Sequence, residues 1–387
     1  MIHTLFHTLC NIAFLRFIWW ILLGVLLMGF AVTDGFDFGV AALLPFVAHS
    51  EIERRTILNT IGPFWEGNQV WIILGAGTIL AAWPLVYATA FSCFYWLIFM
   101  LLLTMGISRP VSFKYRSKLP NLFWRRFWDH VIFLGGVIPG LLFGILIGNV
   151  LCGIPFYLDP SLRVFYTGNV GDFFHPFALF CGLTSLSMLT MHGSLYLMMK
   201  TEGAIYQRSL TASRWMSIVF MLCFVLTCLW AAYALSGYQI IGFMDPKGVS
   251  NPLHKHVMVQ IGAWRHHNVL FPANWLAPLI TCVGAMSVCF LSYLKQNRLA
   301  FLCSGLAIMS TIASVGLNMF PFILPSSTHP ASSLLVWDAS SSTGTLLLML
   351  IVAVFFLPII LLYTSWVYYV LRGKVTGETI AQNKQAY

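Results

Sequence analysis

The sequence has few charged residues. Asp, Glu, Lys and Arg together make up 9% of its 387 residues, whereas hydrophobic residues make up 59%. Soluble globular proteins contain about 25% charged residues, so this composition excludes an ordinary soluble fold. The mean hydropathy of +0.83 points the same way. We therefore predict an all-α polytopic membrane protein.

The short motifs of several common activities are also missing. The sequence has no G-x-x-x-x-G-K-[ST] phosphate loop, no C-x-x-C-H and no H-E-x-x-H. ATP-driven transport and covalent heme attachment are therefore unsupported. The 9 cysteines, of which Cys10 is the first, are scattered without a C-x-x-C pair. We interpret them as small apolar core residues and predict no metal site.

Long apolar windows are what the sequence does have. Each transmembrane helix needs about 20 mainly apolar residues. We predict a single integral membrane domain over residues 1–387, with nine helices arranged as two helical bundles plus a peripheral helix. The expected spans are 14–33, 62–83, 85–107, 131–151, 176–199, 215–236, 270–293, 299–322 and 346–371.

The basic residues lie mostly on one side of this predicted membrane domain. Placing the loops alternately puts 16 of the 21 Lys and Arg residues on one side, with Lys384 the last of them. Basic residues concentrate in cytoplasmic loops. We therefore predict a bacterial inner-membrane protein with a periplasmic N-terminus and a cytoplasmic C-terminus. The net charge of +9 then reflects topology and not nucleic-acid binding.

Two acids follow the first apolar run. Asp34 and Asp37 are three residues apart, so they share a face of a continuing helix, and Gly35 and Gly39 permit close approach of another helix. Acids near the membrane interior are costly and often handle protons. They could instead cap a helix or pair with a base at the membrane interface.

A second group of polar residues begins the next span. Trp65, Glu66, Gln69 and Trp71 place an acid, an amide and two indoles at one end of a helix. Such a group could form a proton entrance or a quinone-ring site. Alternatively, the indoles anchor the helix at the membrane interface and Glu66 favours the helix N-terminus.

The remaining candidates are better explained by structure than by chemistry. Arg109 begins a basic loop that is expected to set topology and contact anionic lipid, or to pair with Glu66 or Asp37. Asp129 is expected to pair with this loop. His192 is the one histidine well inside a span. Because bis-histidine heme ligation needs two facing ligands, we expect a satisfied buried histidine there.

Several motifs, taken in order, resemble subunit II of cytochrome bd-type quinol oxidases. They are A-V-T-D-G-F-D-F-G-V at 31–40, W-E-G-N-Q-V-W at 65–71, A-A-W-P-L-V-Y-A at 81–88, R-P-V-S-F-K-Y-R-S-K at 109–118, Y-T-G-N at 166–169, S-N-P-L at 250–253, M-F-P-F-I-L-P-S-S-T at 319–328 and V-W-D-A-S-S-S at 336–342. The resemblance covers nearly the whole chain.

The resemblance implies a terminal oxidase of the aerobic respiratory chain, a quinol:oxygen oxidoreductase that takes protons for water from the cytoplasm. It implies a heterodimer in which subunit I ligates two b hemes and heme d, while this chain ligates no heme. A structural ubiquinone in this chain and a small third subunit are consistent with it. The partners are then subunit I, quinol and lipids, with no nucleic acid.

The family's site residues carry over to matching positions. Asp34 and Asp37 match the paired acids of a proton path, and Glu66 matches an acid that feeds protons. Trp65, with Gln69 and Trp71 nearby, would border the quinone. The resemblance assigns Arg109, Asp129 and Asp338 to structural ion pairs. The alternative function is a proton-coupled secondary transporter, which predicts interrupted helices in two matched halves.

Overall fold

The computed structural model describes residues 11–376, so Cys10 and Lys384 lie outside the described residues. Within this range the chain is mostly helical, and the prediction of an all-α polytopic membrane protein is confirmed. The helices are α2 (Ile12–Val47), α3 (Glu51–Ile61), α4 (Trp65–Asn68), α5 (Val70–Ala82), α6 (Pro84–Cys93), α7 (Tyr95–Leu101), the π-helix η1 (Leu102–Ser108), α8 (Arg109–Tyr115), α9 (Leu122–Cys152), α10 (Pro176–Lys200), α11 (Gly203–Tyr233), α12 (Ala263–Leu270), α13 (Leu276–Tyr293), α14 (Asn297–Met319) and α15 (Thr343–Val370).

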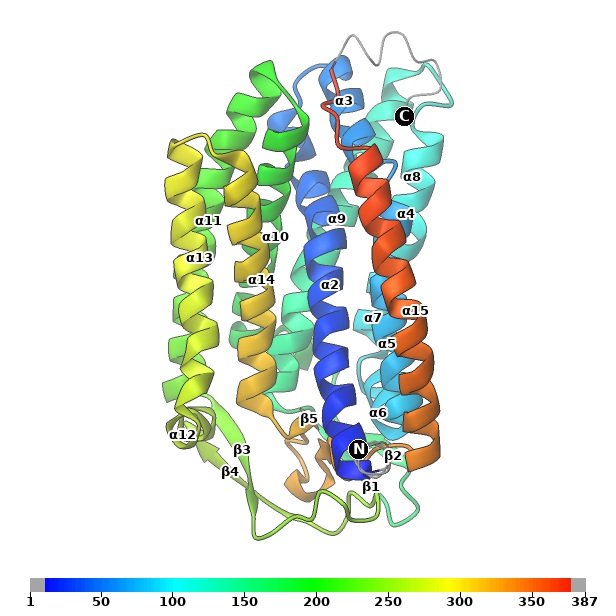
Figure 1. The fold of residues 1–387 in the computed structure, drawn as a ribbon, viewed down its shortest axis with the longest axis vertical. Coiled ribbons are helices and arrows are strands. Elements are labelled where there is room, and N and C mark those ends of the chain that lie inside the picture. The colour runs from blue at the N-terminus through cyan, green and yellow to red at the C-terminus, as the bar shows by residue number, and fades with distance from the viewer. Residues whose placement is uncertain (1–10, 377–387) are drawn as a thin grey trace, which may run out of the picture.

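Among residues 11–376, eight helical segments are long and apolar enough to cross a membrane. A ninth is obtained if the bent pair Trp65–Ala82 and Pro84–Cys93 counts as one span. Figure 1 shows α10, α11, α13 and α14 side by side as one bundle and α2, α5, α7 and α9 as another. Helix α15 lies at the edge of the second bundle, and only 6% of its most apolar stretch is buried.

Close backbone contacts hold α2, α9 and α10 together at the centre. A Cβ atom at Gly39 would lie 2.0 Å from the carbonyl oxygen of Leu189, and Gly193 faces Gly39 in return. Gly136 of α9 likewise faces the backbone of α2, because a Cβ atom there would lie 2.6 Å from the Phe38 carbonyl oxygen. Glycine at these positions lets the helices approach closely. The close approach that Gly39 predicts is thus present.

The second and third expected spans have different boundaries in the structure. Trp83 leaves the helical conformation and Pro84 starts a new helix, so α6 turns by 118° from the preceding helix. The next candidate span begins at Tyr95 and continues through η1 and α8 to Tyr115. Hydropathy does not detect such a change of direction. As a result, Arg109 belongs to a helix and not to a loop.

Short strands gather at one end of the molecule. They form three antiparallel hairpins: β1 (Phe156–Leu158) with β2 (Val164–Tyr166), β3 (Ser236–Ile241) with β4 (His256–Ile261), and β5 (Phe322–Leu324) with β6 (Leu334–Leu335). We call this the hairpin end, and the opposite end, which carries α3 and α8, the α3 end (Figure 1).

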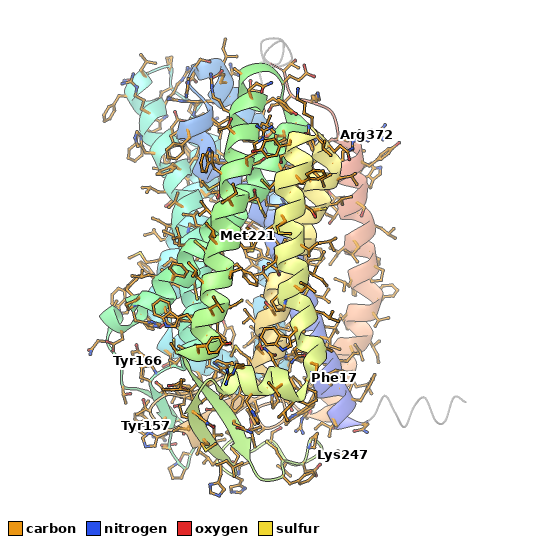
Figure 2. The ribbon with its side chains drawn as sticks, turned by 90° about the vertical axis from the view of Figure 1, so that its left-hand side faces the viewer. Phe17, Tyr157, Tyr166, Met221, Lys247 and Arg372 are labelled. Atoms are coloured by element: carbon orange, nitrogen blue, oxygen red, sulfur yellow. The ribbon has the colours of Figure 1, made fainter. Side chains whose placement is uncertain are left out.

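Short 3-10 helices complete the fold: η2 (Val170–Phe174), η3 (Pro272–Trp275) and η4 (Pro330–Ser332). Figure 2 shows Tyr157, Tyr166 and Lys247 at the hairpin end and Arg372 at the opposite end. The long helices of the two bundles therefore run between two ends that carry different polar structures.

Candidate proton site

Two acids of α2 meet one base of α8 inside the second bundle. Arg109 Nη1 donates to Asp34 Oδ1 at 3.0 Å, and Arg109 Nη2 lies 3.6 Å from Asp37 Oδ2. All three side chains are 0% exposed. The Arg109 guanidinium also lies 4.5 Å from the centre of the Phe38 ring, a cation–π arrangement. We call Asp34, Asp37 and Arg109 the acid cluster.

The acid cluster is only partly satisfied. Asp34 Oδ2, Asp37 Oδ1, and Arg109 Nε and Nη2 are buried without a hydrogen-bond partner. Two carboxylates against one guanidinium also leave one negative charge unbalanced when all three are ionised. An uncompensated charge in a low-dielectric interior is strongly unfavourable. One bound proton would make the cluster neutral, so the arrangement is chemically suited to hold and release a proton.

Sequence reasoning missed two members of this site. Asn68 Nδ2 donates to Asp37 Oδ2 at 2.8 Å and to the carbonyl oxygen of Thr33 at 3.2 Å. The Asn68 Oδ1 atom accepts from the Tyr368 hydroxyl at 2.7 Å. Asn68 was detectable, because it lies three residues after Trp65 and so shares its buried face. No local pattern marked Tyr368, which comes from α15.

The short helix α4 separates the residues of the second polar group. Trp65 is buried and stacks on Phe113 with ring centres 5.7 Å apart, and its Nε1 atom has no partner. Glu66 points outward: its side chain is 66% exposed and lies 3.4 Å from Lys114 Nζ. Gln69 Nε2 donates to the carbonyl oxygen of Met105 at 3.2 Å.

Trp71 is the last member of this group. It is buried against α2, where its ring would lie 2.7 Å from a Cβ atom at Gly29. Trp71 thus contributes to helix packing.

The other residues of this group differ in exposure. Glu66 is solvent-accessible in this chain, while Asn68, only two residues later, reaches the acid cluster.

Asp129 belongs to a different set of ion pairs, at the α3 end. Arg116 donates through all three nitrogens, to Asp129 and Glu51, with the Glu51 contacts at 3.0 and 3.1 Å. Arg54 donates to Asp129 at 3.1 Å, and Arg125 to Glu51 at 3.2 Å. We call these five residues the arginine network. It ties α3, α8 and the start of α9 together.

Asp338 forms an ion pair at the hairpin end. Its Oδ2 atom accepts from Lys255 Nζ at 2.7 Å, and its Oδ1 atom from the Leu335 N–H at 2.9 Å. Burial raises the pKa of the Asp338 carboxyl, although Lys255 acts in the opposite direction. Burial likewise lowers the pKa of Lys255. Desolvation thus outweighs attraction for both groups, and the pair fixes loops in place without driving stability.

The histidine inside a span has no nitrogen left for a metal. His192 Nδ1 lies 2.7 Å from Ser304 Oγ, and Nε2 lies 3.0 Å from the carbonyl oxygen of Val32. Between residues 11 and 376 there is no group of three or more His, Cys, Asp or Glu side chains that could hold a metal ion. The surroundings of His192 do not fit heme ligation.

Sequence comparisons agree over almost the whole chain. The profile of the family described as cytochrome bd terminal oxidase subunit II matches residues 15–371. A "Probable cytochrome oxidase subunit 2" of Haemophilus influenzae is 45% identical over 96% of this chain and 98% of its own length. The "Cytochrome bd-I ubiquinol oxidase subunit 2" of Escherichia coli is 43% identical, covering 95% of this chain and 97% of its own.

A solved structure supports the same fold. The bd oxidase from Geobacillus thermodenitrificans contains a chain that matches with a TM-score of 0.63, covering 92% of this chain and 97% of that one. At 16% sequence identity, this likeness concerns the fold alone.

Proposed function

The chain belongs to the family of cytochrome bd terminal oxidase subunit II, and we propose that its acid cluster carries protons toward the oxygen-reducing site of the complex. The complex is a quinol:oxygen oxidoreductase of the respiratory chain, with heme cofactors and a subunit I partner. Family membership supports this function and not the transporter alternative. It also makes the chain a multi-pass inner-membrane protein.

One observation carries the proton proposal: Asp34 and Asp37 are fully buried around a single Arg109. A purely structural cluster would be expected to balance its charges and satisfy its hydrogen bonds. With all three groups ionised, this cluster carries a net negative charge and leaves polar atoms of each side chain without a partner. Reduction of dioxygen to water consumes protons, and buried acids are the usual groups that hold them inside a membrane protein.

Glu66 would receive protons from solvent in this scheme. It lies on the same short helix as Asn68, which hydrogen-bonds Asp37. A solvent-exposed carboxylate exchanges protons rapidly, and α4 places it two residues from the amide that contacts Asp37. The cluster would then connect the α3 end with the interior.

We expect Glu66→Gln to lower quinol-dependent oxygen uptake per heme about a hundredfold, the lower end of the range usual for loss of a proton-transferring group. Asp37→Asn should lower it at least as much. The complex is purified through a tag on this chain, and heme content is measured by a reduced-minus-oxidised absorption spectrum of the same sample. Heme content should stay near that of the unmodified complex.

Glu202→Gln is a matched control. Glu202 is also an exposed acid, 58% exposed, with Lys374 Nζ at 2.8 Å. The Glu202→Gln variant should leave oxygen uptake unchanged. If Glu66→Gln and Asp37→Asn give intact complexes with normal oxygen uptake, the proton assignment is wrong.

The hemes belong to subunit I in this proposal, because His192 has no free nitrogen. The absorption spectrum of the hemes also distinguishes a complex that contains heme d from one that contains a different heme in its place. We further propose a structural ubiquinone beside Trp65, whose buried Nε1 has no acceptor in this chain; a quinone carbonyl would accept from such an N–H. Extraction of quinone from Trp65→Phe and unmodified complexes tests this.

We orient the α3 end toward the cytoplasm, since α3, α8 and the start of α9 carry much of the basic charge. The C-terminus is then cytoplasmic and the N-terminus periplasmic. Labelling a cysteine introduced at the exposed position 202 from either side of the membrane checks the orientation. Purification of the complex through the tag also shows whether a small third subunit and lipids accompany this chain and subunit I.

A further inference from the structure

Helix α15 reaches the acid cluster although it is barely covered by the rest of the chain. Its most apolar stretch is 6% buried, yet Tyr368 is inserted between neighbouring aromatic rings. The Tyr368 ring stacks on Phe64 with centres 4.8 Å apart, and it meets the edge of Phe36 at 6.3 Å. Its hydroxyl donates to Asn68 Oδ1 at 2.7 Å. Tyr368 therefore links the edge of the bundle to its centre.

The last turn of α15 is held where this contact forms. Lys200, at the end of α10, donates through Nζ to the carbonyl oxygen of Leu371. The Val375 N–H returns a hydrogen bond to the Lys200 carbonyl oxygen at 2.8 Å. These contacts fix the backbone within a few residues of Tyr368. The tyrosine hydroxyl is thus held in position against Asn68.

The hydroxyl helps to hold the Asn68 amide in the orientation that faces Asp37. A side-chain amide has an oxygen that only accepts and a nitrogen that only donates. Tyr368 donates to Oδ1, while the Nδ2 atom donates to Asp37 Oδ2 at 2.8 Å and to the Thr33 carbonyl oxygen, so three contacts together fix the amide. Without the tyrosine hydroxyl, Oδ1 loses this donor, and the amide is held only by its two Nδ2 contacts.

Asp37 depends on this amide more than Asp34 does. Arg109 makes its hydrogen bond to Asp34 at 3.0 Å but stays 3.6 Å from Asp37. The other oxygen of Asp37, Oδ1, has no partner. Asn68 is therefore the direct hydrogen-bond donor that the geometry gives to Asp37.

We infer that Tyr368 is a positioning residue for Asp37, acting through Asn68, so that the docking of α15 sets the hydrogen bonding of the acid that carries the proton. This inference rests on the proposed function of the acid cluster. It assigns to the edge helix a role in proton transfer beyond membrane anchoring. A neutral tyrosine and a neutral amide suffice, because neither needs to ionise.

The test compares Tyr368→Phe with Tyr369→Phe in the purified complex. Tyr369 is the next residue, is 63% exposed and lies under Arg372, so its variant removes a hydroxyl from the same turn without touching Asn68. We expect Tyr368→Phe to lower oxygen uptake per heme about fivefold, the order expected for one lost hydrogen bond. Tyr369→Phe should leave it unchanged, and both should keep the heme content.

Two further readouts separate positioning from general damage. Infrared difference spectra should show a carboxyl band that Asp37→Asn removes, that Tyr368→Phe shifts and that Tyr369→Phe leaves in place. In addition, Tyr368→Phe should change uptake by less than about twofold when Asn68→Ala is already present, because residues acting through one contact are not additive. A full additional fivefold loss in the double variant would overturn the inference.

The outcomes distinguish this inference from the proposal on which it rests. If Asp37→Asn keeps normal oxygen uptake, the proton function of the cluster fails. If Asp37→Asn is impaired while Tyr368→Phe matches Tyr369→Phe in both uptake and infrared spectrum, the cluster keeps its function and the role of Tyr368 is refuted.

Discussion

The acid cluster and the arginine network are both built from acids and arginines, but their hydrogen bonding differs. In the network, all three side-chain nitrogens of Arg116 donate to carboxylates, and three arginines face two acids. In the acid cluster, one arginine faces two acids, and both carboxyl groups keep an oxygen without a partner. The network also lies nearer to solvent, since Arg54 and Glu51 are about one third exposed.

This difference separates a structural site from a functional one. In the arginine network three arginines face two acids and several side chains contact solvent, so no buried carboxylate is left unbalanced, and the network can fasten α3 to α8 and α9. The acid cluster has neither an excess of arginine nor solvent contact, and its charge balance depends on a proton. Mutations in the arginine network should therefore change stability alone, whereas mutations in the acid cluster should change turnover as well.

The largest effect should come from removing Arg109. Arg109→Leu leaves Asp34 and Asp37 as two buried acids without a base, and breaking a buried ion pair costs about 3–5 kcal/mol. We expect loss of most assembled complex, measured as heme recovered with the tagged chain. Arg109→Lys keeps the charge and should recover part of the yield. Normal yield of Arg109→Leu would show that the cluster holds its protons without a counter-charge.

A smaller effect is expected in the arginine network. Asp129→Asn removes a partner of Arg116 and Arg54 but leaves the paired contacts of Arg116 with Glu51. We expect a loss of about 1–3 kcal/mol in stability, the usual range for a hydrogen bond to a charged group, with oxygen uptake per heme unchanged. Thermal unfolding of the purified complex measures the loss of stability. A tenfold loss of turnover would instead place Asp129 on the proton path.

The smallest effect concerns Glu53, next to the network on α3. Burial alone would raise the pKa of its carboxyl, but hydrogen bonds from the His49 and Ser50 N–H groups and from Arg208 lower it below its ordinary value. A carboxyl with a lowered pKa in the fold stabilises the protein above its unfolded pKa, and this contribution is lost as pH falls through the folded value.

Glu53→Gln should therefore lower stability by about 1 kcal/mol or less near pH 7. Its thermal midpoint should approach that of the unmodified complex as the pH is lowered toward 4. A difference that stays constant with pH would mean that the carboxylate charge is not what stabilises α3.

The sequence was sufficient for the fold class and the family because both depend on features that are local in the chain. Apolar windows of about 20 residues indicate transmembrane helices wherever they occur, and ordered motifs such as W-E-G-N-Q-V-W identify relatives. Asp34 and Asp37 could be identified for the same reason, since acids beside apolar runs are conspicuous. The helix bend at Trp83 could not be located by hydropathy, because the mean hydropathy of a window does not depend on the direction of the helix axis.

What the sequence determined by itself is therefore a basic, multi-span type of membrane protein with Asp34, Asp37 and Glu66 as its notable acids. Tertiary structure decided how these acids are used. It brought Arg109 from a later helix to Asp34, turned Glu66 outward and Asn68 inward on one short helix, and brought Tyr368 to Asn68 across 300 residues. Such contacts depend on how helices pack, and helix packing is not encoded in any one segment.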